Sequence, residues 1–451
     1  MKTIMNKNKI SYYILLLGII AVPFDLVWQI GVIRFTPVEM LLSVGILLTI
    51  IDIVKHREGI INTKYLVPVF VFIGACAVST IEALSKMVAL RETLQYIWLA
   101  CLFVYVLNED KKHRIFLPMA SILVLISVIV SIAGIYQYYF VREPIHFLIT
   151  ATRSRAHGFY DQPNILGGYL SGIIPLVLCL YFISVSESSG IKSTNRWIKF
   201  LFRNRVGLLI SLFIFTMGIM AAYSRASWIG VIGCLVLMVI ILQKKLEWKQ
   251  LIVPFSIICL AVSIFMLDLS YSYIESEDSG VTSLLADRGF SNSQRSLLIV
   301  TAFSMLRDHP IGGIGIGNFQ TRLPEYAPQE LIESMQVDYN DSTKTWFINH
   351  NKPLNTELVH NMLLQIVVET GLIGLVAMLW VFYVYFRVAY LRFKSSMGKQ
   401  ESYMRAGLIM SVISILIGGL FGWPFSHGVQ EILILFMALS VSPIGNESWN
   451  C

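Results

Sequence analysis

The residues best suited to chemistry are one histidine and two arginines that lie far apart in the chain. Arg155 and Arg225 stand beside apolar runs, and His360 stands at the start of another. An arginine within a membrane costs about 2.5–3.5 kcal/mol on insertion scales, so it usually has a partner or a task. Guanidinium groups bind phosphate through paired hydrogen bonds, and a neutral imidazole accepts protons. These residue types favour an anion site beside a general base.

Each of these residues also has a structural interpretation. Arg225 lies in a five-residue connection between two apolar runs, where a guanidinium can reach lipid phosphate. Arg155 precedes a run that opens with Pro163, which suits the first turn of a helix, and it can anchor a lipid headgroup there. His360 can cap a helix or contact a neighbouring one. Taken singly, no position decides between structure and chemistry.

Two carboxylates lie near His360 in the sequence. Glu357 precedes it by three residues, so a helix through both would place them on one face, where Glu357 can orient the ring or raise its pKa. Glu369 follows His360 by nine residues, which is about 13 Å deeper along such a helix. A carboxylate at that depth suits either a hydrogen bond between helices or catalysis, and the sequence leaves both open.

The composition shows which kind of element must position these residues. Of 451 residues, 56% are hydrophobic and 14% are charged, against the roughly 25% charged of a soluble domain, which excludes an ordinary cytoplasmic enzyme. The excess of 35 basic over 28 acidic residues suits basic cytoplasmic loops, so we expect no nucleic-acid partner. The cysteines lack CxxC spacing, and the glycine run 313–317 lacks the spacing of a nucleotide loop. We therefore expect no metal and no cofactor.

Apolar stretches of about 17–25 residues predict an all-α fold, a polytopic transmembrane helix bundle of about twelve spans. The predicted helices cover residues 11–29, 38–54, 65–83, 88–107, 115–137, 162–184, 206–222, 226–243, 250–268, 359–386, 404–423 and 428–445. The first has a basic flank but no small-residue cleavage site, so we expect a retained span and not a removable signal peptide. The long polar segment before the tenth span contains a helical pattern from Ser293 to just before Pro310, and a second near 329–336.

Basic residues predict the orientation of the bundle. Loops on the side of the N-terminus hold 22 Lys and Arg, whereas the short loops on the other side hold seven. Because basic loops stay in the cytoplasm, we predict that both termini are cytoplasmic and that the long segment is extracytoplasmic. The predicted organisation is nine spans in 1–268, an extracytoplasmic loop domain in 269–358, and three spans with a cytoplasmic C-terminus in 359–451.

Four stretches of the chain carry a resemblance to a known family. They are RAHGFYDQPNILGGYL at 155–170, YSRASWIG at 223–230, the stretch 295–319, and HNMLLQIVVETGLIG at 360–374. In order, spacing and predicted outer location, they are similar to the O-antigen ligase and O-antigen polymerase superfamily of bacterial envelope glycosyltransferases. Members of that superfamily have many spans and one large extracytoplasmic loop late in the chain. The resemblance is strongest over about 150–385.

The resemblance implies a reaction in the bacterial cytoplasmic (inner) membrane, with the active site on the extracytoplasmic side. The donor would be a glycan linked to undecaprenyl diphosphate, and the acceptor a glycan or a lipid. The partners would include the lipid bilayer, together with a chain-length regulator and a flippase of the same pathway. The leaving diphosphate carries two to three negative charges by its chemistry, and fixed guanidinium groups suit it without a metal ion.

The implied roles fall on named residues. Arg225 and Arg295 would bind the diphosphate, with Arg155 assisting and Arg288 as a second candidate for the loop arginine. His360 would take the proton from the acceptor hydroxyl as this attacks the anomeric carbon with inversion. The implied substrate-binding residues beside it are Glu357 and Asn361. The loop aromatics Tyr326, Tyr339 and Trp346 suit either sugar stacking or a small loop core.

Other functions account for part of the same pattern. Within the superfamily, a ligase transfers glycan to lipid A core and a polymerase to another carrier-linked repeat, and the sequence leaves this choice open. A polytopic transporter or flippase of lipid-linked glycan would also have many spans. That class predicts two similar halves and a central cytoplasmic loop, and the sequence shows neither feature.

Overall fold

A computed structural model describes most of the chain. It covers residues 2–24, 28–30, 33–56, 66–141, 148–150, 153–186, 204–243, 247–275, 280–334, 337–340, 345–348, 352–353, 358–396 and 398–443. Some predicted features lie outside the described residues, among them Glu357 and the basic loops at 57–65 and 187–203.

Apolar helices form the body of the structure. They are α1 (Lys2–Ala21), α2 (Pro37–His56), α3 (Val67–Ser79), α4 (Lys86–His113), α5 (Phe116–Phe140), α6 (Pro163–Ser186), α8 (Arg205–Ala221), α9 (Arg225–Leu242), α10 (Trp248–Glu275), α14 (Met362–Lys394), α15 (Lys399–Gly419) and α16 (Val429–Val441). Two hairpins in the connections pair β1 (Trp28–Ile30) with β2 (Ile33–Phe35) and β3 (Leu148–Thr150) with β4 (Arg153–Ser154).

The apolar helices occupy the stretches predicted from the sequence. Within the described residues, eight helices are long and apolar enough to cross a membrane: α2, α4, α5, α6, α9, α10, α14 and α15. Four more, α1, α3, α8 and α16, have apolar stretches of 10–17 residues. The protein is therefore a polytopic helical membrane protein, and the count of about twelve spans stays a prediction.

The centre of the bundle is α6, whose apolar stretch is 89% buried. It packs against α5, α8, α9, α15 and α16. Small residues let these helices approach closely, as is common between membrane helices. A Cβ added to Gly407 of α15, for example, would lie only 2.8 Å from the Cβ of Cys179 on α6. Pro163 begins α6, as predicted, and so fixes where the segment that carries Arg155 meets the bundle.

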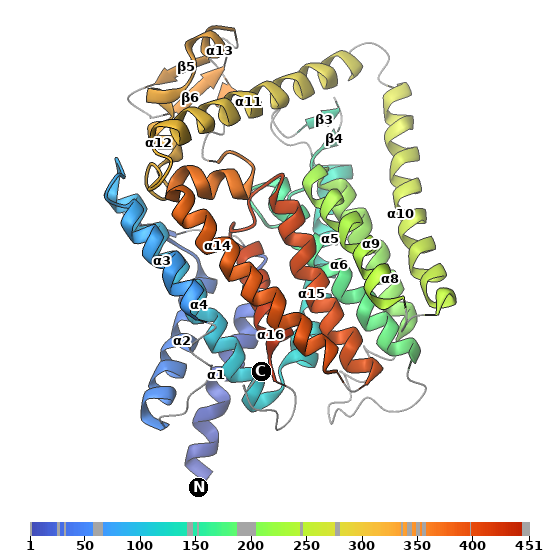
Figure 1. The fold of residues 1–451 in the computed structure, drawn as a ribbon. Coiled ribbons are helices and arrows are strands. Elements are labelled where there is room, and N and C mark those ends of the chain that lie inside the picture. Colours follow the sequence, from blue (N-terminus) through green and yellow to red (C-terminus); the bar gives the residue numbers. More distant parts are fainter. Residues whose placement is uncertain are drawn as a thin grey trace.

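The segment between α10 and α14 lies across one end of the bundle, opposite the start of α1 (Figure 1). It contains α11 (Gly280–Asp308), α12 (Phe319–Tyr326), α13 (Gln329–Ser334), β5 (Val337–Asn340), β6 (Thr345–Ile348) and β7 (Lys352–Pro353). The helix predicted to start at Ser293 starts at Gly280 instead, since no proline interrupts the polar turns before its apolar face. The sequence analysis did not predict α12.

A break in α14 joins this segment to the bundle. Gly371 has φ 68° and ψ −174°, a backbone conformation that interrupts the helical hydrogen bonds and that side chains rarely adopt. The glycine-rich turn after α11 satisfies groups on both sides of the break. Its bonds are Leu372 N to Pro310 O at 2.9 Å, Ile314 N to Val368 O at 3.0 Å and Gly315 N to Glu369 O at 3.0 Å. The end of α11 is thereby fixed to α14.

Candidate anion and general-base site

Arg225 is held at the end of the bundle by a tight turn between α8 and α9. Ala222 is the C-cap residue of α8, Tyr223 has a left-handed φ of 51°, and Arg225 is the first residue of α9. The N-terminus of a helix carries a partial positive charge and free N–H groups, so an arginine there adds to a local positive field. The Arg225 side chain is exposed, and it is available to a ligand.

Arg155 braces this turn from the neighbouring segment. Its Nε and Nη2 donate to the carbonyl of Ala222 at 3.2 and 3.1 Å, and Nη2 also lies 3.4 Å from the carbonyl of Tyr223. Nη2 is 3.0 Å from Oδ1 of Asn164, in the first turn of α6. Arg155 therefore positions Arg225 as well as adding its own charge.

The segment that carries Arg155 is itself fixed by a side chain that the sequence analysis did not single out. Oε1 of Gln137 on α5 accepts from the backbone N–H groups of His157 and Gly158, at 3.1 and 2.7 Å. Nε2 of Gln137 donates to the carbonyl of Gly158 at 2.7 Å. A glutamine inside an apolar run was the available signal, because a buried amide needs partners.

Electrostatic effects show that the structure brings the predicted arginines together. Burial, followed by the positive charges of Arg295 and then Arg225, lowers the pKa of Arg155 to about 10. Burial, followed by the charge of Arg225, also lowers the pKa of Arg295 on α11. Like charges act on one another in this way only at short range. Residues 155, 225 and 295 thus share one site.

Carboxylates contribute little to this site. Within the described part of the chain, the guanidinium groups of Arg225 and Arg295 form no hydrogen bond or ion pair. The charged groups that shift the pKa of Arg155, Arg295 and His360 are arginines and the Tyr223 phenol. A concentration of positive charge without acidic partners is suited to binding an anion with more than one negative charge.

His360 stands just before α14 in a left-handed conformation, with φ 58°. The helix starts at Met362, and Asn361 is its N-cap, accepting from Leu364 N at 2.9 Å. The prediction that Glu357 and His360 share a helix face is therefore wrong, because the helix starts after the Asn361 cap and does not include His360. Nδ2 of Asn361 donates to the carbonyl of Leu420 at the end of α15, at 2.9 Å. Asn361 thus anchors the residue beside it.

Burial, followed by the charge of Arg295, lowers the pKa of His360 to about 4. The sequence analysis allowed a shift to higher pKa from Glu357, which lies outside the described residues, and the shift has the opposite direction. The physical reasons are burial of the ring, first, and the positive charge of Arg295, second. At neutral pH the imidazole is uncharged, which is the form that accepts a proton.

The other predicted site residues have different outcomes. Arg288 lies in α11, but its side chain is outside the described part, as is all of Glu357. Tyr326 of α12 contacts His309, with its hydroxyl 3.2 Å from Nε2. Tyr339 and Trp346 lie opposite each other on β5 and β6. The roles assigned to all of these residues stay predictions.

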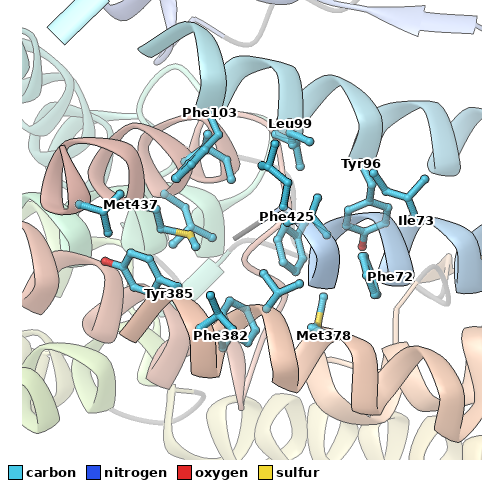
Figure 2. Close-up of a pocket in the computed structure, with 18 of the residues that line it drawn as sticks. Phe72, Ile73, Tyr96, Leu99, Phe103, Met378, Phe382, Tyr385, Phe425 and Met437 are labelled. Carbon is cyan, nitrogen blue, oxygen red and sulfur yellow. The ribbon is translucent and has the colours of Figure 1, made fainter. Parts of the chain in front are cut away.

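A separate apolar pocket of about 150 Å³ lies deeper in the bundle, between α3, α4, α14 and α16. Figure 2 shows that aromatic and sulfur-containing side chains face this space, including Tyr96, Phe103, Phe382 and Met437. No charged side chain lines it. The pocket suits hydrocarbon, and the groups that can bind an anion or move a proton lie at the end of the bundle instead.

The fold and these residues define a class: a polytopic helical membrane protein with a cluster of arginines and a neutral histidine at one end of its bundle. Residues 210–379 match the family model described as O-antigen ligase, and this part of the chain contains Arg225, Arg295 and His360. This match confirms the resemblance seen in the sequence to the O-antigen ligase and polymerase superfamily. No curated protein matches the chain.

Proposed function

We propose that this protein is a membrane glycosyltransferase that moves a glycan from undecaprenyl diphosphate to an acceptor hydroxyl during assembly of a cell-surface polysaccharide. The family match supports a glycosyl-transferring enzyme that uses a lipid-linked glycan, and it does not favour the transporter alternative. The observation that carries the proposal is the meeting of Arg155, Arg225 and Arg295 with a neutral His360.

The charges of the site fit the leaving group of this reaction. The diphosphate of the donor is a polyanion, and Arg225 and Arg295 have guanidinium groups without protein partners in the described part of the chain. Each charge-assisted hydrogen bond to phosphate contributes about 1.5–3 kcal/mol. As the glycosidic bond breaks, negative charge grows on the diphosphate oxygen, so these bonds strengthen in the transition state and speed the reaction.

His360 acts as the general base. The acceptor hydroxyl gives its proton to the neutral imidazole while its oxygen forms a bond to the anomeric carbon. The bond from that carbon to the diphosphate oxygen breaks, and the electron pair leaves with the polyprenyl diphosphate. Because attack and departure occur on opposite faces in a single displacement, the configuration of the anomeric carbon inverts. The two arginines perform the charge stabilisation that a metal ion performs in other transferases.

Bound substrate raises the basicity of His360. Burial, followed by the charge of Arg295, lowers the pKa of the imidazole to about 4. A diphosphate beside Arg295 offsets the second of these effects, so donor binding raises the pKa of the imidazole in part. The base stays neutral at physiological pH with or without the donor.

The proposed topology follows from the predicted loop charges. About twelve spans cross the cytoplasmic membrane of a bacterium, both termini are cytoplasmic, and the site faces outward. The loop domain 269–358 covers the site between the spans in 1–268 and those in 359–451. Arg295 is its arginine that binds the donor, and Arg288 is the second candidate for that role. Asn361 and Glu357 contribute to substrate binding beside His360.

A transfer assay tests the proposal. Purified protein in detergent receives a synthetic polyprenyl diphosphate glycan, with either a carrier-linked repeat or a lipid A core as acceptor, and with a chelator present. We expect transfer to one acceptor, insensitivity to the chelator, and an inverted linkage by NMR. The acceptor that reacts separates polymerase from ligase. Absence of transfer to both acceptors by a folded protein would refute the enzyme, and loss of activity with the chelator would refute the metal-free mechanism.

A further inference from the structure

Two polar side chains buried in the first turns of α14 have no role in the reaction described so far. Gln365 is 1% exposed and Glu369 is 4% exposed. Burying a carboxylate is costly unless it is well hydrogen-bonded, so its partners matter. Glu369 is also the residue whose role the sequence left open between packing and catalysis.

A chain of hydrogen bonds leads from Glu369 to Val359, the residue before His360. Nε2 of Gln365 donates to Oε1 of Glu369 at 2.8 Å. Oε1 of Gln365 accepts from the backbone N–H of Val359 at 2.7 Å, and Val359 is directly followed by His360. The amide of Gln365 therefore has both its ends in use, and the bond to Glu369 fixes which end faces Val359.

The same carboxylate also contacts the segment that follows Arg295. The backbone N–H of Phe319 lies 3.4 Å from Oε1 of Glu369, and the N–H of Gly317 donates to this carboxylate as well. These residues end the glycine-rich turn after α11, the helix that bears Arg295. Glu369 thus lies where the segment before His360 and the segment after α11 meet.

We propose that Glu369 and Gln365 are positioning residues that hold His360 in its left-handed conformation, in register with the helix that bears Arg295. This role rests on the proposed function of His360. A non-glycine residue with positive φ persists only where its surroundings fix it. The Asn361 cap fixes one side of His360, and the bond from Val359 to Gln365 fixes the other. Without Glu369, the Gln365 amide is free to turn and the second constraint weakens.

An exchange of the two side chains tests this role. In Glu369→Gln alone, the N–H groups of the new buried amide at position 369 lack an acceptor. In Gln365→Glu alone, two carboxylates lie next to each other and repel. In the double variant Glu369→Gln/Gln365→Glu, the new amide donates to the new carboxylate. The oxygen of that amide still accepts from Phe319, and the second carboxylate oxygen accepts from Val359. The double variant thus restores the chain of bonds in reverse.

We expect each single variant to lower kcat by about 10- to 100-fold, the size of one charge-assisted hydrogen bond. Affinity for polyprenyl diphosphate should stay within about threefold, because backbone bonds still fix the turn after α11. The double variant should recover most of the activity. Thr301→Val is the matched control, since it removes another buried polar group, a hydroxyl bonded to the carbonyl of Leu297. It should leave kcat unchanged.

Hydrogen exchange of the Val359 amide gives a readout that does not depend on transfer. We expect exchange at least about tenfold faster in the single variants and restored protection in the double variant. Unchanged protection or kcat in the single variants would overturn the positioning role, as would a double variant no better than the singles or a parallel loss of diphosphate affinity. If the wild-type protein transfers no glycan while these exchange changes occur, the proposed function fails and the hydrogen-bonded link stands.

Discussion

Replacing Arg225 by alanine separates two effects of the arginine cluster. One is its effect on the stability of the protein without an anion, and the other is its contribution to binding an anion. The charge of Arg225 opposes those of Arg155 and Arg295, and it lowers the pKa of both. Removal of Arg225 therefore relieves repulsion. Because its side chain is exposed and screened by solvent, the gain is on the order of 0.2–1 kcal/mol. We expect a melting temperature equal to or slightly above that of the wild type.

With a diphosphate bound, the same substitution acts in the opposite direction. A bidentate guanidinium makes two charge-assisted hydrogen bonds, which together contribute about 3–6 kcal/mol. At about 1.4 kcal/mol per tenfold, Arg225→Ala should lower kcat/KM by roughly 10²- to 10⁴-fold. Arg225→Lys keeps the charge but not the planar fork. It should also fail to support chain transfer at a useful rate.

Two measurements on the same samples check this prediction. Thermal unfolding with and without inorganic pyrophosphate reports stability and anion binding, and transfer from the synthetic donor reports catalysis. The control is Arg205→Ala, at the opposite end of α8, where the guanidinium binds the carbonyl of Ser184 at 3.0 Å. A variant at 225 that binds pyrophosphate as tightly as the wild type would refute the anion site. A large loss of stability without ligand would refute the argument from repulsion.

Three further predictions follow from individual contacts. The pKa of His360 is lowered to about 4, so the neutral base predominates above that pH and kcat/KM should fall only as the pH drops through about 4. Arg295→Ala removes one cause of the lowered pKa, so the fall in kcat/KM should occur at higher pH in that variant. Arg155→Met removes the bonds to Ala222 and should lower the free energy of unfolding by about 1–3 kcal/mol, with weaker pyrophosphate binding, in thermal titrations. Gly371→Ala places a side chain at the left-handed break, against the Ile311 carbonyl, and should lower the free energy of unfolding by about 1–3 kcal/mol. Gly398→Ala adds a side chain in open space and should leave the free energy of unfolding unchanged in the same assay.

The helices were predictable because the bilayer imposes one rule along the whole chain. A spanning helix must be apolar for most of its length, so apolar runs mark its position without any knowledge of its neighbours. The ends of helices were less predictable, since a cap decides them. One residue, Asn361, shifts the start of α14 past His360, so this helix does not carry His360 and Glu357 on one face.

Two of the arginines were predictable from residue type, and the third was predicted only from the family resemblance. An arginine near the membrane is costly, so Arg155 and Arg225 stand out in the sequence, whereas Arg295 was implied by the resemblance. Gln137 and Gln365 act through hydrogen bonds to backbone groups that lie on other segments or at a helix end. Such bonds depend on where the backbone runs, and no spacing in the sequence encodes them. Consequently, the charged residues were found and the residues that position them were missed.

The conformation of His360 determines which substitution isolates its chemistry. Three described non-glycine residues have positive φ: Arg114, Tyr223 and His360. Arg114 and Tyr223 follow the ends of α4 and α8, where a left-handed residue commonly closes a helix. His360 precedes a helix, so that explanation does not apply to it.

His360→Asn is therefore a sharper test than His360→Ala. Asparagine tolerates left-handed φ better than alanine does, so the Asn variant should keep the stability of the wild type while the Ala variant loses about 1 kcal/mol. Neither side chain can accept a proton at neutral pH, so both should lose about 10²- to 10⁴-fold in transfer and still bind pyrophosphate. Transfer retained by a stable Asn variant would show that another group is the base. Equal stability of the two variants would show that the left-handed backbone at His360 carries no strain.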